Sequence, residues 1–446
     1  MCTWLMIRKT LIYFLLKILN DHRLDYLRYL NSSPAKSFEE LSRIQLEAIK
    51  ELINHSYRNV PFYKYWFDLH DVDISGINSL DDFSDTIPVL TKKDIIKHYD
   101  KFSAPGNIKF VEQSTGGSTG QTLKFRMSRK DHDMGKALLL RGMGKGGYTL
   151  GDRILVLAGG SLVKRKKRKL NLIPKLLNQY KISSYGLSKN DFAEIVSLLE
   201  KKKIRFLRGY ASSIYFLADY CKSKAVSISF KAVFSTGESL LDKQRHLIEE
   251  TFKCKVYNQY GLNDGGVSAF EYDDEDGLVV DMERAFLELA VSTKDNAGTI
   301  LATSLYNYSF PFIRYDTGDS GTLEVRELKS GERRPVITKL LGRVTEYLLI
   351  NDRRIGGPVL TVLMGKTNAE QYSIIQKGEN ELEIQIKKGI NYSKKDEDFI
   401  IKSFEDNCGT NLSIKFTYVD AFSNKNKHRF IINEVDSPKV NQNKLK

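Results

Sequence analysis

Cysteine, proline and tryptophan are scarce in this 446-residue chain, with four, nine and two residues respectively. The cysteines show no paired spacing, which argues against a disulfide framework and against a zinc site and favours a reducing cytoplasm. There is no internal repeat or low-complexity domain, only a polar tail that follows position 435. The four cysteines are Cys2, Cys221, Cys254 and Cys408.

The chain also lacks a long hydrophobic segment near its N-terminus. The longest apolar run there, Leu11–Leu16, ends at Lys17, far short of the roughly 20 residues needed to cross a bilayer. We therefore expect neither a secretory signal nor a spanning helix in this region. Residues 1–36 are expected to form an amphipathic helical segment, which either packs on the main domain or lies on a membrane surface.

Signatures of nucleophilic catalysis and of histidine-based metal sites are missing as well. The seven histidines fall at no spacing typical of metal ligands. No Gly-x-Ser-x-Gly nucleophile elbow is present. The sequence therefore gives no support for a serine hydrolase or for a histidine metal centre.

What the chain does have is the composition of a globular protein and a strongly basic balance. Hydrophobic residues make up 41% and charged residues 28%, and the net charge is +14. At this length, two or more domains are expected. One run, Lys164–Lys169, concentrates six cations, which suit either an anionic partner or a solvated loop. Because no aromatic residues interleave these charges, we expect no nucleic-acid partner.

The middle of the chain alternates between helix-like and strand-like segments, which predicts a large α/β domain with βαβ-built sheets over residues 37–342. Its first helix is expected after a capping pattern at Ser37, and a second after Thr91. Expected helices further on span residues 191–200, 212–222 and 242–252. Expected strands span residues 154–158, 204–207, 232–234, 255–257, 299–303 and 312–315.

After residue 342 the pattern changes to strand, helix and strand within about 40 residues, which predicts a small α+β domain. Leu382, Ile384 and Ile386 alternate with polar residues, and residues 412–418 repeat this alternation after an expected helix over 396–407. We assign residues 343–437 to this small, mobile lid domain and residues 438–446 to the polar tail.

The most informative segment is a loop rich in glycine and hydroxyl residues between two apolar flanks. Glycine lets backbone approach a ligand closely, and consecutive N–H groups with hydroxyls form a nest that suits a polyphosphate. The loop lacks the Gly-Lys-Ser/Thr ending of a Walker A motif, and its flanks predict the tip of a β-hairpin. The candidate phosphate-binding residues are Ser114, Thr115, Gly116, Gly117, Ser118, Thr119 and Gly120.

Three further segments follow in order: Tyr257–Asp264, Arg314–Asp319 and Gly342-Arg343. Together with the glycine-rich loop, they resemble the adenylate-forming enzymes, and most of all the phenylacetate–CoA ligase branch with its capsule-biosynthesis relatives. The resemblance covers residues 37 to about 432. It implies a two-domain ligase that uses ATP, magnesium and coenzyme A.

The resemblance also implies roles for individual residues. Asp264 would ligate Mg²⁺, although the family usually has Glu there, and Lys427 would be the catalytic lysine that contacts the carboxylate and the α-phosphate. Gln121, Thr345 and Asn426 are further departures from the family pattern. Residues that would line the adenine and ribose are Gly237, Glu238, Ser239, Tyr260, Gly261, Asp319 and Arg343.

Three functions remain open at this point. The first is activation of a carboxylic acid or amino acid as an acyl-adenylate, followed by transfer to coenzyme A. The second keeps the adenylation but uses an amino-sugar acceptor in surface polysaccharide biosynthesis. The third is an inactive nucleotide-binding scaffold. We expect a cytoplasmic protein, either free or peripheral on the cytoplasmic face of a membrane.

Overall fold

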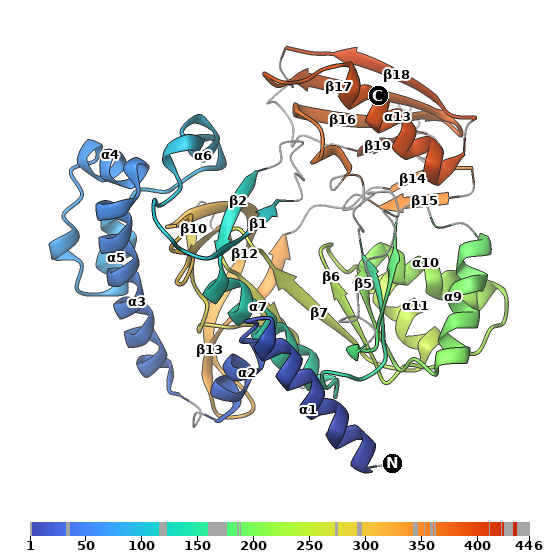
Figure 1. The fold of residues 1–446 in the computed structure, drawn as a ribbon, viewed down its shortest axis with the longest axis horizontal. Helices are drawn as coiled ribbons and strands as arrows, with labels where there is room; N and C mark the ends of the chain where they lie inside the picture. The colour runs from blue at the N-terminus through green and yellow to red at the C-terminus, as the bar shows by residue number, and fades with distance from the viewer. Residues whose placement is uncertain are drawn as a thin grey trace, which may run out of the picture.

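The computed structural model describes residues 2–32, 36–115, 123–158, 176–184, 187, 189–272, 275–291, 297–341, 347–351, 353–356, 360, 363–409, 411–420, 422 and 431–434. The described part of the chain forms a large α/β body and a smaller C-terminal layer of sheet and helix (Figure 1). Fold class is thus as the sequence predicts.

Helices are the main elements of the first hundred residues, as far as the structure describes them. Ser37 caps one of them, accepting a hydrogen bond from the backbone N–H of Glu40, and Thr91 and Asp94 form a complete capping box at another. Both caps were expected from the sequence. The helices are α1 (Cys2–Ile18), α2 (Arg23–Ser32), α3 (Phe38–Asn59), α4 (Pro61–Leu69), α5 (Leu80–Thr86) and α6 (Lys92–Lys97).

A hairpin of β1 (Phe110–Ser114) and β2 (Lys124–Ser128) follows these helices and carries the glycine-rich loop at its tip. Helix α7 (Arg129–Lys145) comes directly after it. The expected hairpin is therefore confirmed, while the loop residues 116–122 lie outside the described part of the chain.

The large sheet has eleven strands in the order β10-β11-β12-β13-β9-β8-β7-β6-β5-β3-β4. The half from β7 to β4 is parallel, with helical crossovers, as βαβ units require. Its elements are β3 (Ile154–Ala158), β4 (Gln179–Ser183), α9 (Lys189–Lys202), β5 (Phe206–Tyr210), α10 (Ala211–Ser223), β6 (Ala232–Thr236), α11 (Asp242–Phe252) and β7 (Val256–Gly261).

The other half of this sheet is antiparallel. The strand expected over residues 312–315 is wrong, because Phe312 and Ile313 are buried loop residues that pack beside Phe125 and Phe310, and pairing begins only at Tyr315. The strands are β8 (Ser268–Phe270), β9 (Leu278–Val280), β10 (Ala285–Val291), β11 (Gly298–Ser304), β12 (Tyr315–Glu327) and β13 (Arg333–Leu341).

Two apolar cores cover the two faces of the parallel half. Helices α9, α10 and α11 pack on one face, around Leu155, Leu207 and Val233. On the other face, Met143 of α7 packs with Phe206 and further aromatic residues. Alternate residues of each strand therefore point to different layers, and this alternation decides which side chains share a face in the arguments below.

The C-terminal layer is a four-stranded sheet in the order β18-β17-β16-β19, with one helix and its own apolar core. Figure 1 shows it at the same end of the molecule as the β1–β2 hairpin, whereas the N-terminus lies at the opposite end. Residues 342–346, where we expect the domain boundary, lie outside the described residues. The elements are β14 (Tyr347–Ile350), β15 (Arg353–Gly356), β16 (Ala369–Gly378), β17 (Glu381–Lys388), α13 (Lys394–Cys408), β18 (Ser413–Tyr418) and β19 (Ile431–Asn433).

Candidate active site

The base of the glycine-rich loop is fixed by the last pairing of the hairpin. The backbone N–H of Thr115 donates to the carbonyl of Leu123 at 2.8 Å, and the N–H of Leu123 donates back to Thr115 Oγ1 at 2.9 Å. Ser114 ends β1 and is exposed. The remaining candidate phosphate residues, Gly116 to Gly120, lie outside the described part of the chain, so their role stays a prediction.

Tyr260 and Asp319, two residues predicted to bind the nucleotide, contact each other directly. The Tyr260 hydroxyl donates to Asp319 Oδ2 at 3.1 Å, although 59 positions separate them. Tyr260 is buried at the end of β7. Asp319 follows Gly318, whose φ of 74° breaks the regular strand, a conformation that glycine adopts without strain. The two motifs that carry these residues therefore meet in space.

Asp264, the predicted magnesium ligand, lies beside this pair. Its Oδ2 accepts a hydrogen bond from the Tyr315 hydroxyl at 3.4 Å. Burial raises the pKa of the Asp264 carboxyl to about 6, although the charge of Lys92 opposes this shift, and the nearby charge of Asp319 adds to it. The result is a cluster of two carboxylates and two tyrosine hydroxyls, the tyrosine–aspartate cluster: Tyr260, Asp264, Tyr315 and Asp319.

Lys92 is a charged neighbour of this cluster that the sequence analysis did not assign. Leu90 pairs with Tyr315, donating to the carbonyl of Arg314 at 3.0 Å and accepting from Asp316 at 2.9 Å. This pairing brings the start of α6 beside β12. The order of the motifs does not predict that Lys92 lies near Asp264, because this proximity depends on pairing between segments more than 200 residues apart.

The loop after β6 carries three further candidates, Gly237, Glu238 and Ser239. Gly237 has a φ of 76°, and a Cβ at this position would lie 2.9 Å from the Tyr210 ring. Glycine is therefore required both by the backbone conformation and by the close approach of the aromatic ring. This places Tyr210, at the end of β5, against the predicted adenine-binding loop.

Glu238 makes its described contacts with protein groups. Its carboxylate accepts hydrogen bonds from the backbone N–H and the hydroxyl of Ser212, at 2.6 and 2.9 Å. Ser212 lies in the first turn of α10, where backbone N–H groups lack partners and favour an anion. Burial nevertheless raises the pKa of Glu238 to about 7. The carboxylate thus anchors the loop to α10.

Arg314 opens the segment that ends at Asp319, and its side chain holds neighbouring elements together. Its Nε donates to Glu288 Oε1 at 2.5 Å, and its Nη1 donates to the carbonyl of Ile87. Its φ of 46° is unusual for a non-glycine residue. The arginine, which immediately precedes β12, therefore links the start of that strand to β10 and to the segment before α6.

The structure brings together Gly261, Tyr260, Asp264 and Asp319 at the ends of β7 and β12. Arg343 and Lys427 lie outside the described residues, so their places in the site stay predictions. A carboxylate whose burial raises its pKa, with hydroxyls around it, is a donor set that suits a hard oxygen-preferring cation such as Mg²⁺. Among the described residues, no group of three or more His, Cys, Asp or Glu side chains is placed to hold a metal ion.

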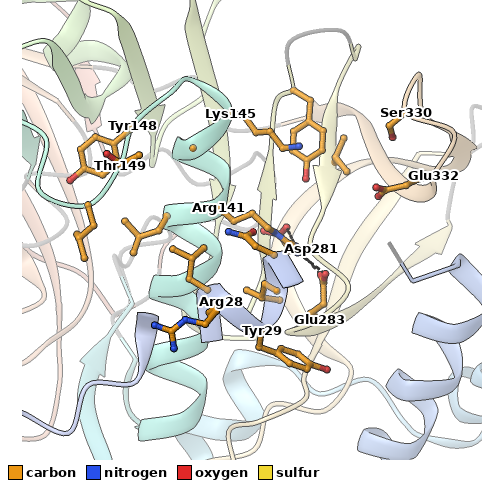
Figure 2. A pocket seen from close by; sticks show the side chains of 18 of the residues that line it. Arg28, Tyr29, Arg141, Lys145, Tyr148, Thr149, Asp281, Glu283, Ser330 and Glu332 are labelled. Carbon is orange, nitrogen blue, oxygen red and sulfur yellow. Dashed lines mark hydrogen bonds and ion pairs between the residues drawn. The ribbon is translucent and has the colours of Figure 1, made fainter. Parts of the chain in front are cut away.

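A cavity of about 1400 Å³ lies elsewhere, between α2, α7 and the antiparallel half of the sheet. Inside it, Arg141 donates hydrogen bonds to Asp281 at 2.5 Å and to Glu283 at 2.7 Å. Figure 2 shows these three side chains turned toward one another. None of the described residues that we predict to bind the nucleotide lines this cavity. Its central charges are therefore paired with one another and stand apart from the tyrosine–aspartate cluster.

Known proteins share this arrangement of strands and helices. The structure superposes on 2-hydroxyisobutyryl-CoA ligase, crystallised with 2-HIB-AMP and CoA, with a TM-score of 0.61 over 90% of this chain and 91% of that one, at 18% identity. In sequence, the chain is 27% identical to protein CapK of Staphylococcus aureus over 327 residues, 71% of each chain. It is 24% identical to the phenylacetate–CoA ligase of Thermus thermophilus over 339 residues, 70% of this chain and 72% of the ligase.

The chain belongs to the adenylate-forming superfamily. Within this superfamily it is a relative of the phenylacetate–CoA ligases, and the enzyme class that follows is an AMP-forming ligase. No protein-family model matches the sequence. Acyl-adenylate formation with ligation to coenzyme A is the general activity of these relatives, and ATP and coenzyme A are their general co-substrates.

Proposed function

We propose that the enzyme activates a carboxylic acid with ATP, forming an acyl-adenylate and pyrophosphate, and then transfers the acyl group to coenzyme A. The observation that carries this proposal is the tyrosine–aspartate cluster at the ends of β7 and β12. It joins two motifs of the predicted nucleotide site through the hydrogen bond from Tyr260 to Asp319. Similarity to the phenylacetate–CoA ligases supports the choice of reaction.

In this proposal, each of the following residues has one task. Asp319, oriented by Tyr260, accepts the ribose hydroxyls, because a carboxylate can accept two hydrogen bonds at once. Asp264 holds Mg²⁺, which neutralises charge on the leaving pyrophosphate. Thr115 is at the base of the loop that grips the phosphates, and Gly237 lets the adenine approach the β6 loop closely. Lys427 supplies the cation at the developing charge of the transition state.

The decisive experiment is exchange of labelled pyrophosphate into ATP across a panel of acids, with magnesium present. Exchange that depends on one class of acid is expected, since adenylation is reversible before transfer. No exchange with any acid, together with ATP binding in a calorimetric titration, would instead mean an inactive nucleotide-binding scaffold. Adding coenzyme A to the active acid should then yield a thioester.

A second acceptor is favoured by one observation, the similarity to CapK at a higher identity than to the phenylacetate–CoA ligases. The capsule-biosynthesis resemblance suits an enzyme that transfers the acyl or aminoacyl group to an amino sugar. With the preformed acyl-adenylate supplied, coenzyme A and amino sugars compete in one assay. The acceptor that consumes the adenylate at the higher kcat/KM is the substrate.

We infer that α1 holds the enzyme on an anionic membrane surface. Ile12 and Leu16 are buried against the body, but Leu11, Phe14 and Ile18 are 54%, 56% and 81% exposed. These three residues lie one helical turn apart on a single stripe. The net charge of +14 favours an anionic surface. No described helix is long and apolar enough to cross a membrane, so the helix would lie in the interface.

A further inference from the structure

Two cations, Arg208 and Lys181, lie on the same face of the parallel sheet. Arg208 is in β5 and Lys181 in β4, and both are in register with Val156 of the strand between them. Residues in register on neighbouring strands point to the same face. This is the face that α7 covers, since Phe206, two residues before Arg208, packs with Met143.

Neither cation has a counter-charge among the described residues. The Nη2 of Arg208 donates to the neutral amide oxygen of Gln259 at 3.1 Å, and its Nε is buried without a hydrogen-bond partner. Lys181 makes no ion pair in the described part of the chain. The sequence around β3 and β4 supplies no carboxylate for them either, because residues 153–190 contain ten Lys or Arg and no Asp or Glu.

An unpaired cation is costly when it is buried, as the Nε of Arg208 is, whereas Lys181 lies exposed on the edge strand β4. Burial lowers the pKa of Arg208, and burial together with the charge of Arg208 lowers the pKa of Lys181. Arg23, which also lowers the pKa of Lys181, is already paired with Asp21. The arrangement is therefore electrostatically incomplete, as a site for an anionic ligand is before the ligand binds.

The face also opens at these residues. Phe206, Phe234 and Tyr257 are buried on this face. Arg208, which is in register with Phe234, and Gln259, which lies one step closer to the carboxyl ends, keep partial exposure. In open α/β sheets, ligands bind at the carboxyl ends of the strands, so the transition from closed core to open face occurs where a ligand would enter.

The cation pair adjoins the predicted nucleotide site on two sides. Gln259, which accepts from Arg208, immediately precedes Tyr260 of the tyrosine–aspartate cluster. Tyr210, two residues beyond Arg208 and on the same face, contacts the Gly237 turn. An acid bound with its reacting carboxylate near the nucleotide could thus extend its other end toward Arg208.

We propose that Arg208 and Lys181 form a subsite for a second anionic group of the acid, so that the substrate is an acid with another carboxylate or a phosphate at its far end. A guanidinium in this position offers a planar fork that matches either group. This inference rests on the proposed acid activation and names the chemical class of the acid.

The test uses three acids of matched length: butyrate, succinate and 3-phosphonopropionate. Pyrophosphate exchange by the wild-type enzyme should favour an anion-bearing acid over butyrate by at least about tenfold in kcat/KM, because hydrogen bonds to charged groups contribute roughly 1.5–3 kcal/mol. Preference for succinate or for the phosphonate distinguishes a carboxylate from a phosphate group. Arg208→Gln and Lys181→Gln should each erase the preference, whereas the exposed Lys224→Gln should keep it.

The outcomes separate the inference from the proposed function. Equal exchange with all three acids would overturn the inference and leave acid activation standing. A rise in KM for coenzyme A, rather than for the acid, in Arg208→Gln would also overturn it, since the cations would then serve the acceptor. Absence of exchange with every acid would count against the proposed function itself.

A binding measurement tests the subsite without turnover. Succinate should raise the melting temperature of the wild-type protein more than butyrate does, and Arg208→Gln should remove this difference. Without ligand, Arg208→Gln should melt no lower than wild type, because it removes an unpaired charge and retains an amide donor for Gln259. A large fall in melting temperature would show a structural role for Arg208 and contradict the subsite.

Discussion

At the residue scale, the site depends on two tyrosine hydroxyls that hold two carboxylates. Tyr260 donates to Asp319, and Tyr315 donates to Asp264. Tyrosines buried at strand ends have rigid positions, and each brings a hydroxyl to a fixed point. Because Asp264 and Asp319 also repel each other, a bound cation between the phosphates and Asp264 would relieve this repulsion.

The raised pKa of Asp264 makes magnesium–nucleotide binding depend on pH. Burial raises the folded-state pKa of the Asp264 carboxyl from its ordinary value of 3.8 to about 6, so the carboxylate ionises only as pH rises through about 6. Affinity for the magnesium–ATP complex, measured by calorimetry, should therefore increase from pH 5 to pH 7. Asp264→Asn should bind more weakly and lose this pH dependence.

Unfolding measurements test the raised pKa of Asp264 independently, because the same shift that strengthens nucleotide binding as pH rises should weaken folding stability. The folded state holds the Asp264 proton more tightly than the unfolded state between pH 4 and pH 6, so this residue lowers the stability of the wild type as pH rises through that window. Asp264→Asn should gain stability relative to wild type from pH 4 to pH 7. A constant difference across this range would contradict the assignment of the raised pKa.

The contact between Tyr260 and Asp319 predicts a graded loss of ATP affinity. Asp319→Ala should weaken ATP binding by at least about 1.4 kcal/mol, a factor of ten, since hydrogen bonds to a charged group contribute roughly 1.5–3 kcal/mol. Tyr260→Phe keeps the Asp319 carboxylate but removes the hydroxyl that orients it, so we expect a smaller loss of ATP affinity. Equal affinities for wild type and Asp319→Ala in a calorimetric titration would remove Asp319 from the nucleotide site.

At the scale of elements, α1 has two apolar faces with different partners. Ile12 and Leu16 pack against Leu177 and neighbouring leucines of the body. The other stripe has no described protein cover, and α1 lies at the end of the molecule away from the C-terminal sheet (Figure 1). Binding through α1 would therefore leave the tyrosine–aspartate cluster accessible to substrates.

Vesicle sedimentation tests this role of α1. The full-length protein should bind phosphatidylglycerol vesicles, bind phosphatidylcholine vesicles weakly, and dissociate as salt rises, since an electrostatic contribution is screened by salt. Phe14→Glu should reduce binding at least about tenfold by placing a charge in the apolar stripe. The control is Ile390→Glu, at a fully exposed isoleucine in the C-terminal layer. Similar losses in both variants would exclude a specific role for α1.

At the scale of the whole molecule, the C-terminal layer has its own sheet and core and meets the body near the candidate site. Tyr210, which contacts the Gly237 turn, also packs against the C-terminal core. The nucleotide-binding loop and the small layer thus share one aromatic contact. We expect the small domain to change its orientation around Thr345 and Glu346 between the two half-reactions, by hinge motion.

Lys427 tests this two-step cycle. If the lysine enters the site only for adenylation, Lys427→Ala should severely reduce acyl-adenylate formation and spare transfer from a supplied acyl-adenylate. Both half-reactions should be measured on one preparation of the variant, with Lys425→Ala as the neighbouring control. Equal losses in the two half-reactions would mean that Lys427 serves both steps or supports the fold, and a loss confined to Lys425→Ala would reassign the role.

Much of this protein follows from local sequence. The capping box at Thr91, the helix over residues 242–252 and the strand over residues 154–158 are where the sequence places them, because caps and apolar periodicity act within one or two turns. The hairpin below the glycine-rich loop has the same origin. The order of the motifs was sufficient to indicate the superfamily.

Tertiary structure alone decided which of these residues meet. The electrostatic effect of Lys92 on Asp264 depends on the pairing of Leu90 with Tyr315. The proximity of Arg208 and Lys181 depends on strand order, with β3 between β4 and β5. The hydrogen bond by which Glu238 anchors its loop to α10 is also a tertiary contact that the sequence did not predict. Strand register and order are set by the packing of the whole sheet, and contacts across it therefore cannot be derived from segments considered one at a time.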